Sequence, residues 1–164
     1  MFELTMLVGL IGCVATTLIK KEVKMVTSTP ITGDHIITNC DVRAGTLYPC
    51  LKQQVYACLE TADGERFYGA NWMLNNTVTV CPRVTEGCAT GTGYHLCAEV
   101  CGQGPEYHAE RQAIAACLEA GKSTVGATMY LTGHTYCCET CTAAMIDAGV
   151  TAVQILDTKE VVNY

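Results

Sequence analysis

Two short motifs determine the fold and the chemistry that this sequence predicts: His108-Ala109-Glu110 and Cys138-Glu139-Thr140-Cys141. Each motif stands near the start of a segment with helical features. Residues 106–120 are rich in alanine and amphipathic, residues 138–148 are similar in length, and a glycine follows each segment. Since glycine is typical just beyond the C-terminus of a helix, we predict two helices that each carry one motif near their beginning.

The second motif has the spacing of a pair of metal ligands. Cys138 and Cys141 are three residues apart, so a helix places both side chains on the same side. Their thiolates lie at a helix N-terminus, where unpaired N–H groups and the helix dipole favour negative charge. His108 adds a nitrogen ligand from the other helix. Three ligands leave the fourth position of a tetrahedral zinc ion open, which is typical of a catalytic site.

Glu110 follows His108 by two residues, so its carboxylate can point toward the open position without binding the metal. Zinc lowers the pKa of its water, and a nearby carboxylate can take that proton and deliver it to a leaving group. Attack of hydroxide on an amidine-like carbon, with proton delivery to the ring nitrogen and then to the amine, is hydrolytic deamination. Each motif alone is weak evidence, but together they predict a zinc-dependent hydrolase.

The segments around the motifs predict an α/β fold. Residues 54–59 and 66–68 are rich in strand-forming residues, and the turn dipeptide Asp63-Gly64 lies between them, so we expect a hairpin. Residues 126–132 and 151–156 predict buried strands that follow the two helices. Strands that alternate with helices in this way are expected to be parallel and covered by those helices.

The combination of H-A-E and C-x-x-C at this spacing resembles the zinc-dependent cytidine and deoxycytidylate deaminase superfamily. The resemblance extends upstream and covers about residues 50–156. Cys50-Leu51-Lys52-Gln53-Gln54-Val55, Asp63-Gly64 and Gly69-Ala70-Asn71 are similar to the start of bacterial and phage deoxycytidylate deaminases. The resemblance implies the cytidine-deaminase-like fold of this superfamily. This fold is an α/β three-layer sandwich whose mixed sheet begins with a hairpin and is flanked by helices.

The resemblance also implies an activity, the hydrolysis of dCMP to dUMP and ammonia. The zinc ligands would be His108, Cys138 and Cys141. Glu110 would be the catalytic proton shuttle, and Asn71 would bind the sugar of the substrate through a hydrogen bond. Cys137 stands where the family usually has a proline, and Trp72 replaces a common glycine. These departures leave the metal ligands in place and bear on the identity of the substrate.

The cysteine-containing segment 75–105 has little periodicity, and a loop of this length is usually functional or tied by a metal. In bacterial and phage deoxycytidylate deaminases this region often contributes to a second, structural zinc site. The resemblance implies such a set here: Cys50, Cys81, Cys97 and Cys101. Alternatively, some of these cysteines are small buried apolar residues, as we expect for Cys13, Cys58 and Cys117.

Length and composition limit the alternatives. A chain of 164 residues is one domain's worth, and 49% hydrophobic residues can bury a core. The net charge of −6, with no basic run, disfavours a long nucleic acid and favours a small-molecule nucleotide as the partner. The 12 cysteines, in a chain with apolar periodic segments, favour a reduced, metal-binding protein over a disulfide framework.

Residues 1–30 are expected to form an apolar segment and linker before a deaminase domain at 31–164. The apolar run 6–19 is shorter than the ~20 residues that cross a bilayer, and the lysines that follow it do not fit a signal peptide. We expect a helix that packs on the domain or on a partner chain. If the run did anchor in a membrane, Lys20, Lys21 and Lys24 would keep the rest of the chain in the cytosol. We therefore expect a cytoplasmic protein and disfavour membrane attachment, and we also expect it to form a homo-oligomer.

Other functions remain open at this point. The substrate could be another base or carrier, such as cytidine, a purine or cytosine in a polynucleotide. A non-catalytic, zinc-stabilised binding module would have no need of Glu110. A C-x-x-C thiol oxidoreductase would leave His108-Ala109-Glu110 unexplained. Around the expected pocket, stacking on a pyrimidine and ordinary loop packing are equally compatible with three aromatic residues: Tyr107, His134 and Tyr136.

Overall fold

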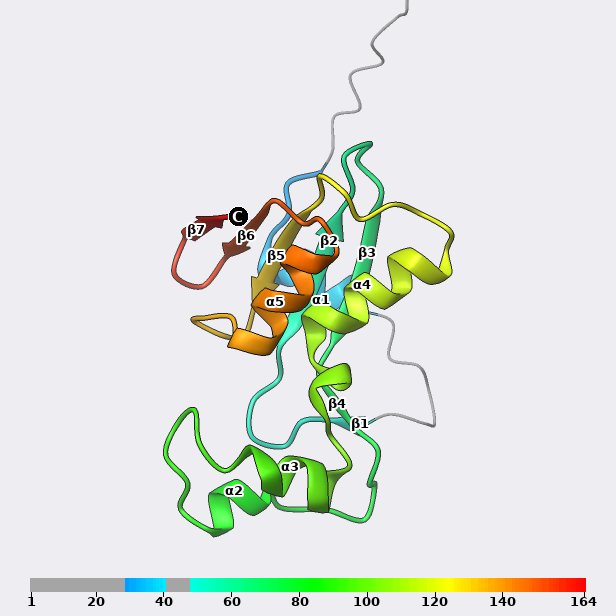
Figure 1. Ribbon diagram of the computed structural model, residues 1–164. Helices are drawn as coiled ribbons and strands as arrows, with labels where there is room; N and C mark the ends of the chain where they lie inside the picture. The colour runs from blue at the N-terminus through cyan, green and yellow to red at the C-terminus, as the bar shows by residue number, and fades with distance from the viewer. Residues whose placement is uncertain (1–28, 41–47) are drawn as a thin grey trace, which may run out of the picture.

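The computed structural model describes residues 29–40 and 48–164 (Figure 1). The predicted N-terminal helix at 6–19 and the first residues of the linker lie outside these ranges. Within them, no helix has both the length and the apolar character that crossing a membrane requires. The cysteines of the described residues are all free.

The centre of the fold is a five-stranded mixed sheet with the order β3-β2-β5-β6-β7. Its strands are β2 (Tyr56–Glu60), β3 (Arg66–Ala70), β5 (Thr128–Thr132), β6 (Ala152–Ile155) and β7 (Glu160–Asn163). The predicted hairpin is confirmed, because β2 pairs antiparallel with β3 around the Asp63-Gly64 turn. The predicted parallel pair is confirmed in β5 and β6. β2 and β7 join this pair in antiparallel register, and the sequence pattern does not predict β7.

Helices cover both faces of the sheet, which confirms the three-layer α/β fold (Figure 1). α4 (Ala109–Glu119) and α5 (Glu139–Asp147) lie on one face, and α1 (Gly33–Asn39) lies on the other. The alternation of side chains along β2 separates two apolar clusters. Leu59 packs with residues of α4 and α5, whereas Cys58 packs with Ile36 of α1. Cys58 and Cys117 are fully buried, as predicted for small apolar residues.

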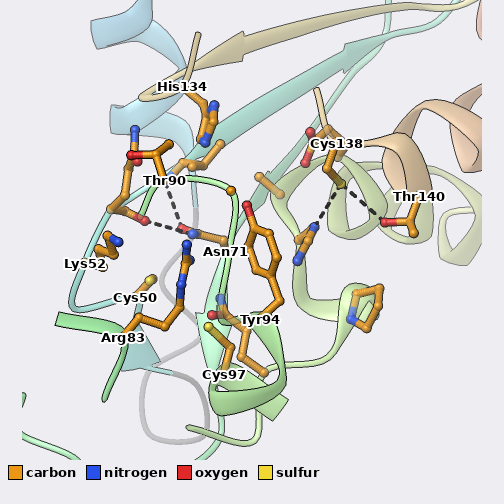
Figure 2. A pocket seen from close by; sticks show the side chains of 18 of the residues that line it. Cys50, Lys52, Asn71, Arg83, Thr90, Tyr94, Cys97, His134, Cys138 and Thr140 are labelled. Carbon is orange, nitrogen blue, oxygen red and sulfur yellow. Dashed lines mark hydrogen bonds between the residues drawn. The ribbon is translucent and has the colours of Figure 1, made fainter. Parts of the chain in front are cut away.

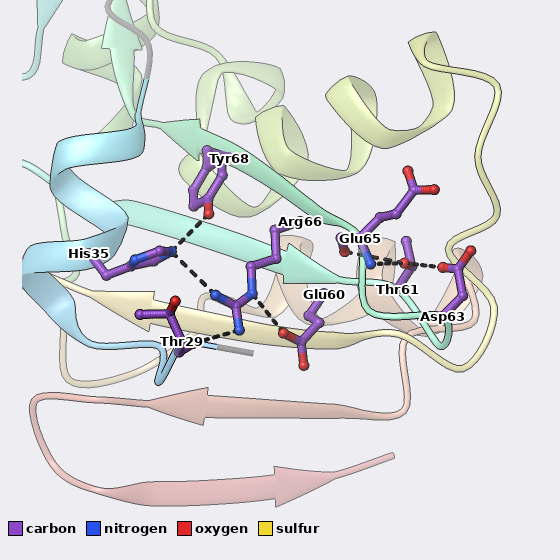
Figure 3. Close-up of polar contacts among 8 residues, drawn as sticks. All are labelled: Thr29, His35, Glu60, Thr61, Asp63, Glu65, Arg66 and Tyr68. Atoms are coloured by element: carbon purple, nitrogen blue, oxygen red, sulfur yellow. Dashed lines mark hydrogen bonds and ion pairs between the residues drawn. The ribbon is translucent and has the colours of Figure 1, made fainter. Parts of the chain in front are cut away.

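A polar network ties α1 to the edge of the sheet (Figure 3). Arg66 on β3 forms an ion pair with Glu60 on β2, with 2.8 Å between Nε and Oε2. Its Nη2 donates to the carbonyl of Thr29 at 2.8 Å. His35 of α1 lies 2.9 Å from the hydroxyl of Tyr68. These contacts hold the start of the described chain on the face opposite α4.

Gly69 allows β3 to pack directly on the backbone of α4. A Cβ atom at this position would lie 2.3 Å from the carbonyl oxygen of Ala109 and 2.4 Å from the amide nitrogen of Ala113. No side chain fits at such distances, and backbone atoms cannot move aside as a flexible side chain can. The glycine therefore sets the distance between the sheet and the first turn of α4.

The segment 75–105 contains more regular structure than the sequence predicts. It includes α2 (Pro82–Thr85), α3 (Tyr94–Cys101) and the start of a 3-10 turn, η1 (Pro105–Tyr107). A small sheet of β1 (Tyr48–Pro49) and β4 (Trp72–Met73) precedes it. α3 is bounded by two glycines in the left-handed region, at φ 73° and 62°. Two of its cysteines, Cys97 and Cys101, are buried, so tertiary packing rather than helical periodicity stabilises it.

Gly69→Ala is expected to lower the free energy of unfolding by about 3 kcal/mol, in the upper part of the range for overpacked sites. The added methyl group must push α4 away from β3. Chemical denaturation of wild type and variant measures the change.

Gly104→Ala is the matched control. Gly104 has φ −84°, which alanine adopts easily, and the three atoms nearest to its added Cβ would belong to the carboxylate of Glu106, a side chain that can turn away. This variant should unfold like wild type or be slightly more stable. Equal destabilisation by both substitutions would show that the close approach at Gly69 is not a constraint.

Candidate metal centre

The two predicted motifs meet where the starts of α4 and α5 lie close together. His108 is the N-cap of α4 and Cys138 is the N-cap of α5, with nearly identical backbone angles: φ −73°, ψ 147° and φ −71°, ψ 154°. Neither side chain forms a capping hydrogen bond with its own helix. Both are therefore available to the space between the helices. Cys141, in the first turn of α5, faces the same space because N-cap and N3 side chains lie near each other.

The three side chains form a compact group of metal-binding atoms. His108 Nδ1 lies 3.3 Å from Cys141 Sγ and 3.5 Å from Cys138 Sγ. A tetrahedral zinc ion with Zn–N of about 2.0–2.1 Å and Zn–S of about 2.3 Å separates such atoms by about 3.5 Å. These two distances therefore suit zinc, and all three ligand atoms lie within 4.8 Å of one another. In the described part of the chain this is the one group of three or more potential ligands brought together in this way.

The electrostatics of the group favour a thiolate before any metal is bound. Hydrogen bonds from the thiol of Cys141, the ring of His108 and the hydroxyl of Thr140 lower the pKa of Cys138 to about 3. The same hydrogen bond and burial raise the pKa of Cys141, and the bond to Cys138 raises the pKa of His108. Cys138 thus carries the negative charge, and Cys141 must release its proton when a metal binds.

Glu110 lies beside this group and is buried, with 5% of its surface exposed. Burial raises the pKa of its carboxyl group, and the negative charge of Cys138 raises it further. The neighbouring Cys137 is not part of the ligand group. Burial and the charge of Glu110 raise the pKa of Cys137 to about 12, so it remains a neutral thiol. The predicted ligand pair, Cys138 and Cys141, is the pair of cysteines that lies close to His108.

An open pocket of about 490 Å³ leads to these residues (Figure 2). His108, Glu110 and Cys138 are among the residues that line it. Segments far apart in sequence form the remaining wall: the stretch before β2, Asn71 after β3, α2 and α3, and the loop between β5 and α5. A pocket of this size is typical of a small-molecule site.

Asn71 lines the pocket as predicted, but its amide already bonds to the backbone. Its Nδ2 donates to the carbonyl of Gln53 and its Oδ1 accepts from the amide of Val55, each at 2.8 Å. One N–H and one oxygen lone pair remain for a ligand. Asn71 therefore holds the segment before β2 at the edge of the pocket, whatever else it contacts.

Two of the predicted aromatic residues, His134 and Tyr136, line the pocket, whereas Tyr107 is not part of its lining. Their rings meet edge to face, with 4.1 Å between centroids. Tyr94 of α3 also lines the pocket, and its hydroxyl lies 3.3 Å from that of Tyr136. That hydrogen bond and burial raise the pKa of Tyr94 to about 12. The sequence analysis missed Tyr94, and Arg83 with it, because both lie in the segment without periodicity.

The four cysteines of the implied second site lie in one region but do not converge. Burial raises the pKa of Cys97, and burial together with the charges of Cys97, Cys81 and Cys50 raises that of Cys101 to about 11. Cys50 and Cys97 also line the pocket. Within residues 29–40 and 48–164, the sulfurs do not form a compact group like that at His108. A second zinc site stays a prediction.

Replacing any of the three ligands should remove one zinc ion per chain. His108→Ala, Cys138→Ser and Cys141→Ser are expected to lose it, because an open three-ligand site cannot spare a donor. Metal analysis of the purified protein gives the ratio.

Cys137→Ser is the matched control and should keep the zinc content of wild type, since Cys137 faces Glu110 rather than the ligand group. Loss of zinc from this variant, or its retention after replacement of Cys141, would contradict the assignment.

One of three comparisons with known proteins identifies a family. Residues 36–157 match the family model described as the cytidine and deoxycytidylate deaminase zinc-binding region. Among solved structures, the cytidine deaminase from Burkholderia pseudomallei is 24% identical, and the match covers 75% of this chain and 83% of that chain with a TM-score of 0.42. Comparison with curated proteins gives no match. The family match spans most of the chain and includes all three ligands, so the chain belongs to the cytidine and deoxycytidylate deaminase zinc-binding family.

Proposed function

We propose that this protein hydrolyses the 4-amino group of dCMP in a zinc-dependent reaction that yields dUMP and ammonia. The observation that carries the proposal is Glu110, a buried carboxyl group with a raised pKa beside three ligand atoms that fit zinc. A purely structural zinc site needs no buried carboxyl group next to it. Buried acids with shifted pKa values are typical of proton transfer at enzyme sites.

His108, Cys138 and Cys141 would hold zinc, and the ion would supply a water whose pKa is lowered toward neutral. Glu110 takes the proton from the attacking water and gives it to N3 of cytosine as the oxygen adds to C4. It then takes the proton of the new C4 hydroxyl and gives it to the amino group. The C4–N4 bond breaks, ammonia leaves and C4 becomes a carbonyl. Every atom of water and dCMP is thereby accounted for in dUMP and ammonia.

The pocket provides support for a nucleotide. The remaining N–H and lone pair of Asn71 are suited to a sugar hydroxyl. His134 and Tyr136, which line the same pocket, are suited to contact the pyrimidine ring. The acidic net charge disfavours a polynucleotide substrate. Assembly as a homo-oligomer and a cytoplasmic location remain part of the proposal.

Glu110→Gln is expected to lower kcat for dCMP at least ~10²-fold, the scale of general acid–base catalysis. The amide keeps the shape of the side chain but cannot exchange protons, so zinc content and thermal stability should stay unchanged. Ammonia release measures the rate, with dCMP, CMP, dCTP, cytidine, adenosine and guanine as candidate substrates.

Glu106→Gln serves as the control, because Glu106 is an exposed acid just before α4 that does not line the pocket. It should react like wild type. Normal turnover by Glu110→Gln would exclude this mechanism, and failure of wild type on every compound would favour a non-catalytic zinc module.

We further propose a structural zinc site at Cys50, Cys81, Cys97 and Cys101, which would tie α3 to the segment before β2. Wild type should then hold close to two zinc ions per chain, and Cys97→Ser should hold one. Because structural zinc stabilises the folded state directly, this variant should melt earlier than wild type.

Cys88→Ser is a suitable control, since Cys88 lies in the same segment outside the set. Wild-type protein with a single zinc ion, and an unchanged ratio in Cys97→Ser, would show that the four cysteines bind no metal.

A further inference from the structure

Arg83 is a buried cation in the wall of the pocket. It belongs to the short helix α2, and only 8% of its surface is exposed. Its guanidinium lies 4.3 Å from the centre of the Tyr94 ring, a distance typical of a cation–π contact. The stem of the side chain passes beside Gly93, where a Cβ atom would lie 3.5 Å from Arg83 Cγ. The ring of Tyr94 therefore helps to position the charge.

Within the protein, this cation lacks a full set of partners. Its Nε is buried and has no hydrogen bond. In the described ranges, no carboxylate forms an ion pair with Arg83. The guanidinium also interacts with the side chain of Cys97. An arginine stays protonated in proteins. A buried guanidinium with no carboxylate partner and an unpaired Nε is costly, which points to an anion supplied from outside.

Arg83 faces the same pocket as the metal centre, at the other end. Lys52 lines this end too, and its Nζ makes only a long contact of 3.4 Å with the carbonyl of Cys88. Figure 2 shows Arg83 and Lys52 on one side of the pocket and Cys138 on the other, with Tyr94 between them in this view. The carboxylates that line the pocket, Glu110 and Glu139, belong to α4 and α5 at the metal end. The pocket thus has a metal-binding end and a cationic end.

We propose that Arg83, assisted by Lys52, binds the 5′-phosphate of a nucleoside monophosphate whose base reaches the metal centre. The inference rests on the proposed deaminase function and specifies the phosphate state of its substrate. A guanidinium offers two parallel N–H donors to phosphate oxygens, and a lysine adds a point charge. Arg83 therefore selects nucleotides over nucleosides, while Glu110 and the metal ligands act on the base.

Binding and turnover of dCMP and deoxycytidine test this subsite. Calorimetry on the zinc-loaded Glu110→Gln protein measures binding without turnover. In turnover assays, wild type is expected to have a higher kcat/KM for dCMP than for deoxycytidine. Adding Arg83→Gln should weaken dCMP binding at least ~30-fold, as expected when one partner of a charge-assisted contact is removed. Binding of deoxycytidine should change less than about threefold. Arg83→Lys keeps the charge but loses the paired donors, so its affinity for dCMP should lie between that of the protein with Arg83 and that of Arg83→Gln.

Lys122→Gln is the matched control, because it removes one positive charge from an exposed ion pair with Glu65, outside the pocket. It should leave both affinities unchanged. Equal binding of dCMP and deoxycytidine by the unsubstituted pocket would overturn the proposal. So would equal losses for both ligands in Arg83→Gln, or a loss of zinc and stability in that variant, since these mark a structural role beside Cys97.

Failure of the deaminase function is distinguishable from failure of the subsite. If no cytosine compound is turned over, but dCMP and inorganic phosphate still bind in a manner that depends on Arg83, the deaminase proposal is wrong and the anion subsite is supported. If dCMP and deoxycytidine are both deaminated with a ratio that Arg83→Gln does not change, the deaminase proposal is supported and the subsite is wrong.

Discussion

The contact between β3 and the first turn of α4 positions the rest of the site. Gly69 brings the strand against the backbone at Ala109, the residue between His108 and Glu110. The metal ligand and the buried carboxyl group are therefore held by the sheet itself and not by a mobile loop. α5 follows β5 across the same face and brings Cys138 and Cys141 to the same point. Side chains on regular elements are positioned more accurately than side chains on loops.

The sequence was most informative where the local pattern and the chemistry agreed. The hairpin, the parallel pair and both helices have periodic apolar residues and clear turn or stop signals, and all of them were predicted. The ligand group was predictable because spacing on a helix fixes which side chains share a face. The family match supports a zinc-binding region over residues 36–157, the range that contains these three residues. A dCMP substrate did not follow from this evidence, since metal ligands determine the reaction and not the carrier of the base.

The wall of the pocket could not be predicted in the same way. α2 and α3 are short, α3 is bounded by glycines, and both depend on contacts with distant residues. Arg83 and Tyr94 have no spacing that marks them as neighbours, and only the folded segment places one over the other. The amide of Asn71 illustrates the opposite case. Its place in the pocket was predicted, but its bonds to Gln53 and Val55 depend on a backbone conformation that the sequence does not reveal.

His108 and Cys138 occupy helix N-caps, where other residues would stabilise α4 and α5 more. Serine, threonine, asparagine and aspartate are the residues that best stabilise a helix start, by about 1 kcal/mol relative to a residue that does not cap. Selection for stability alone would favour them at both positions and would erase the metal centre. Attempts to make this protein more heat-resistant by optimising helix caps must therefore exclude α4 and α5, where the less stable choice is the functional one.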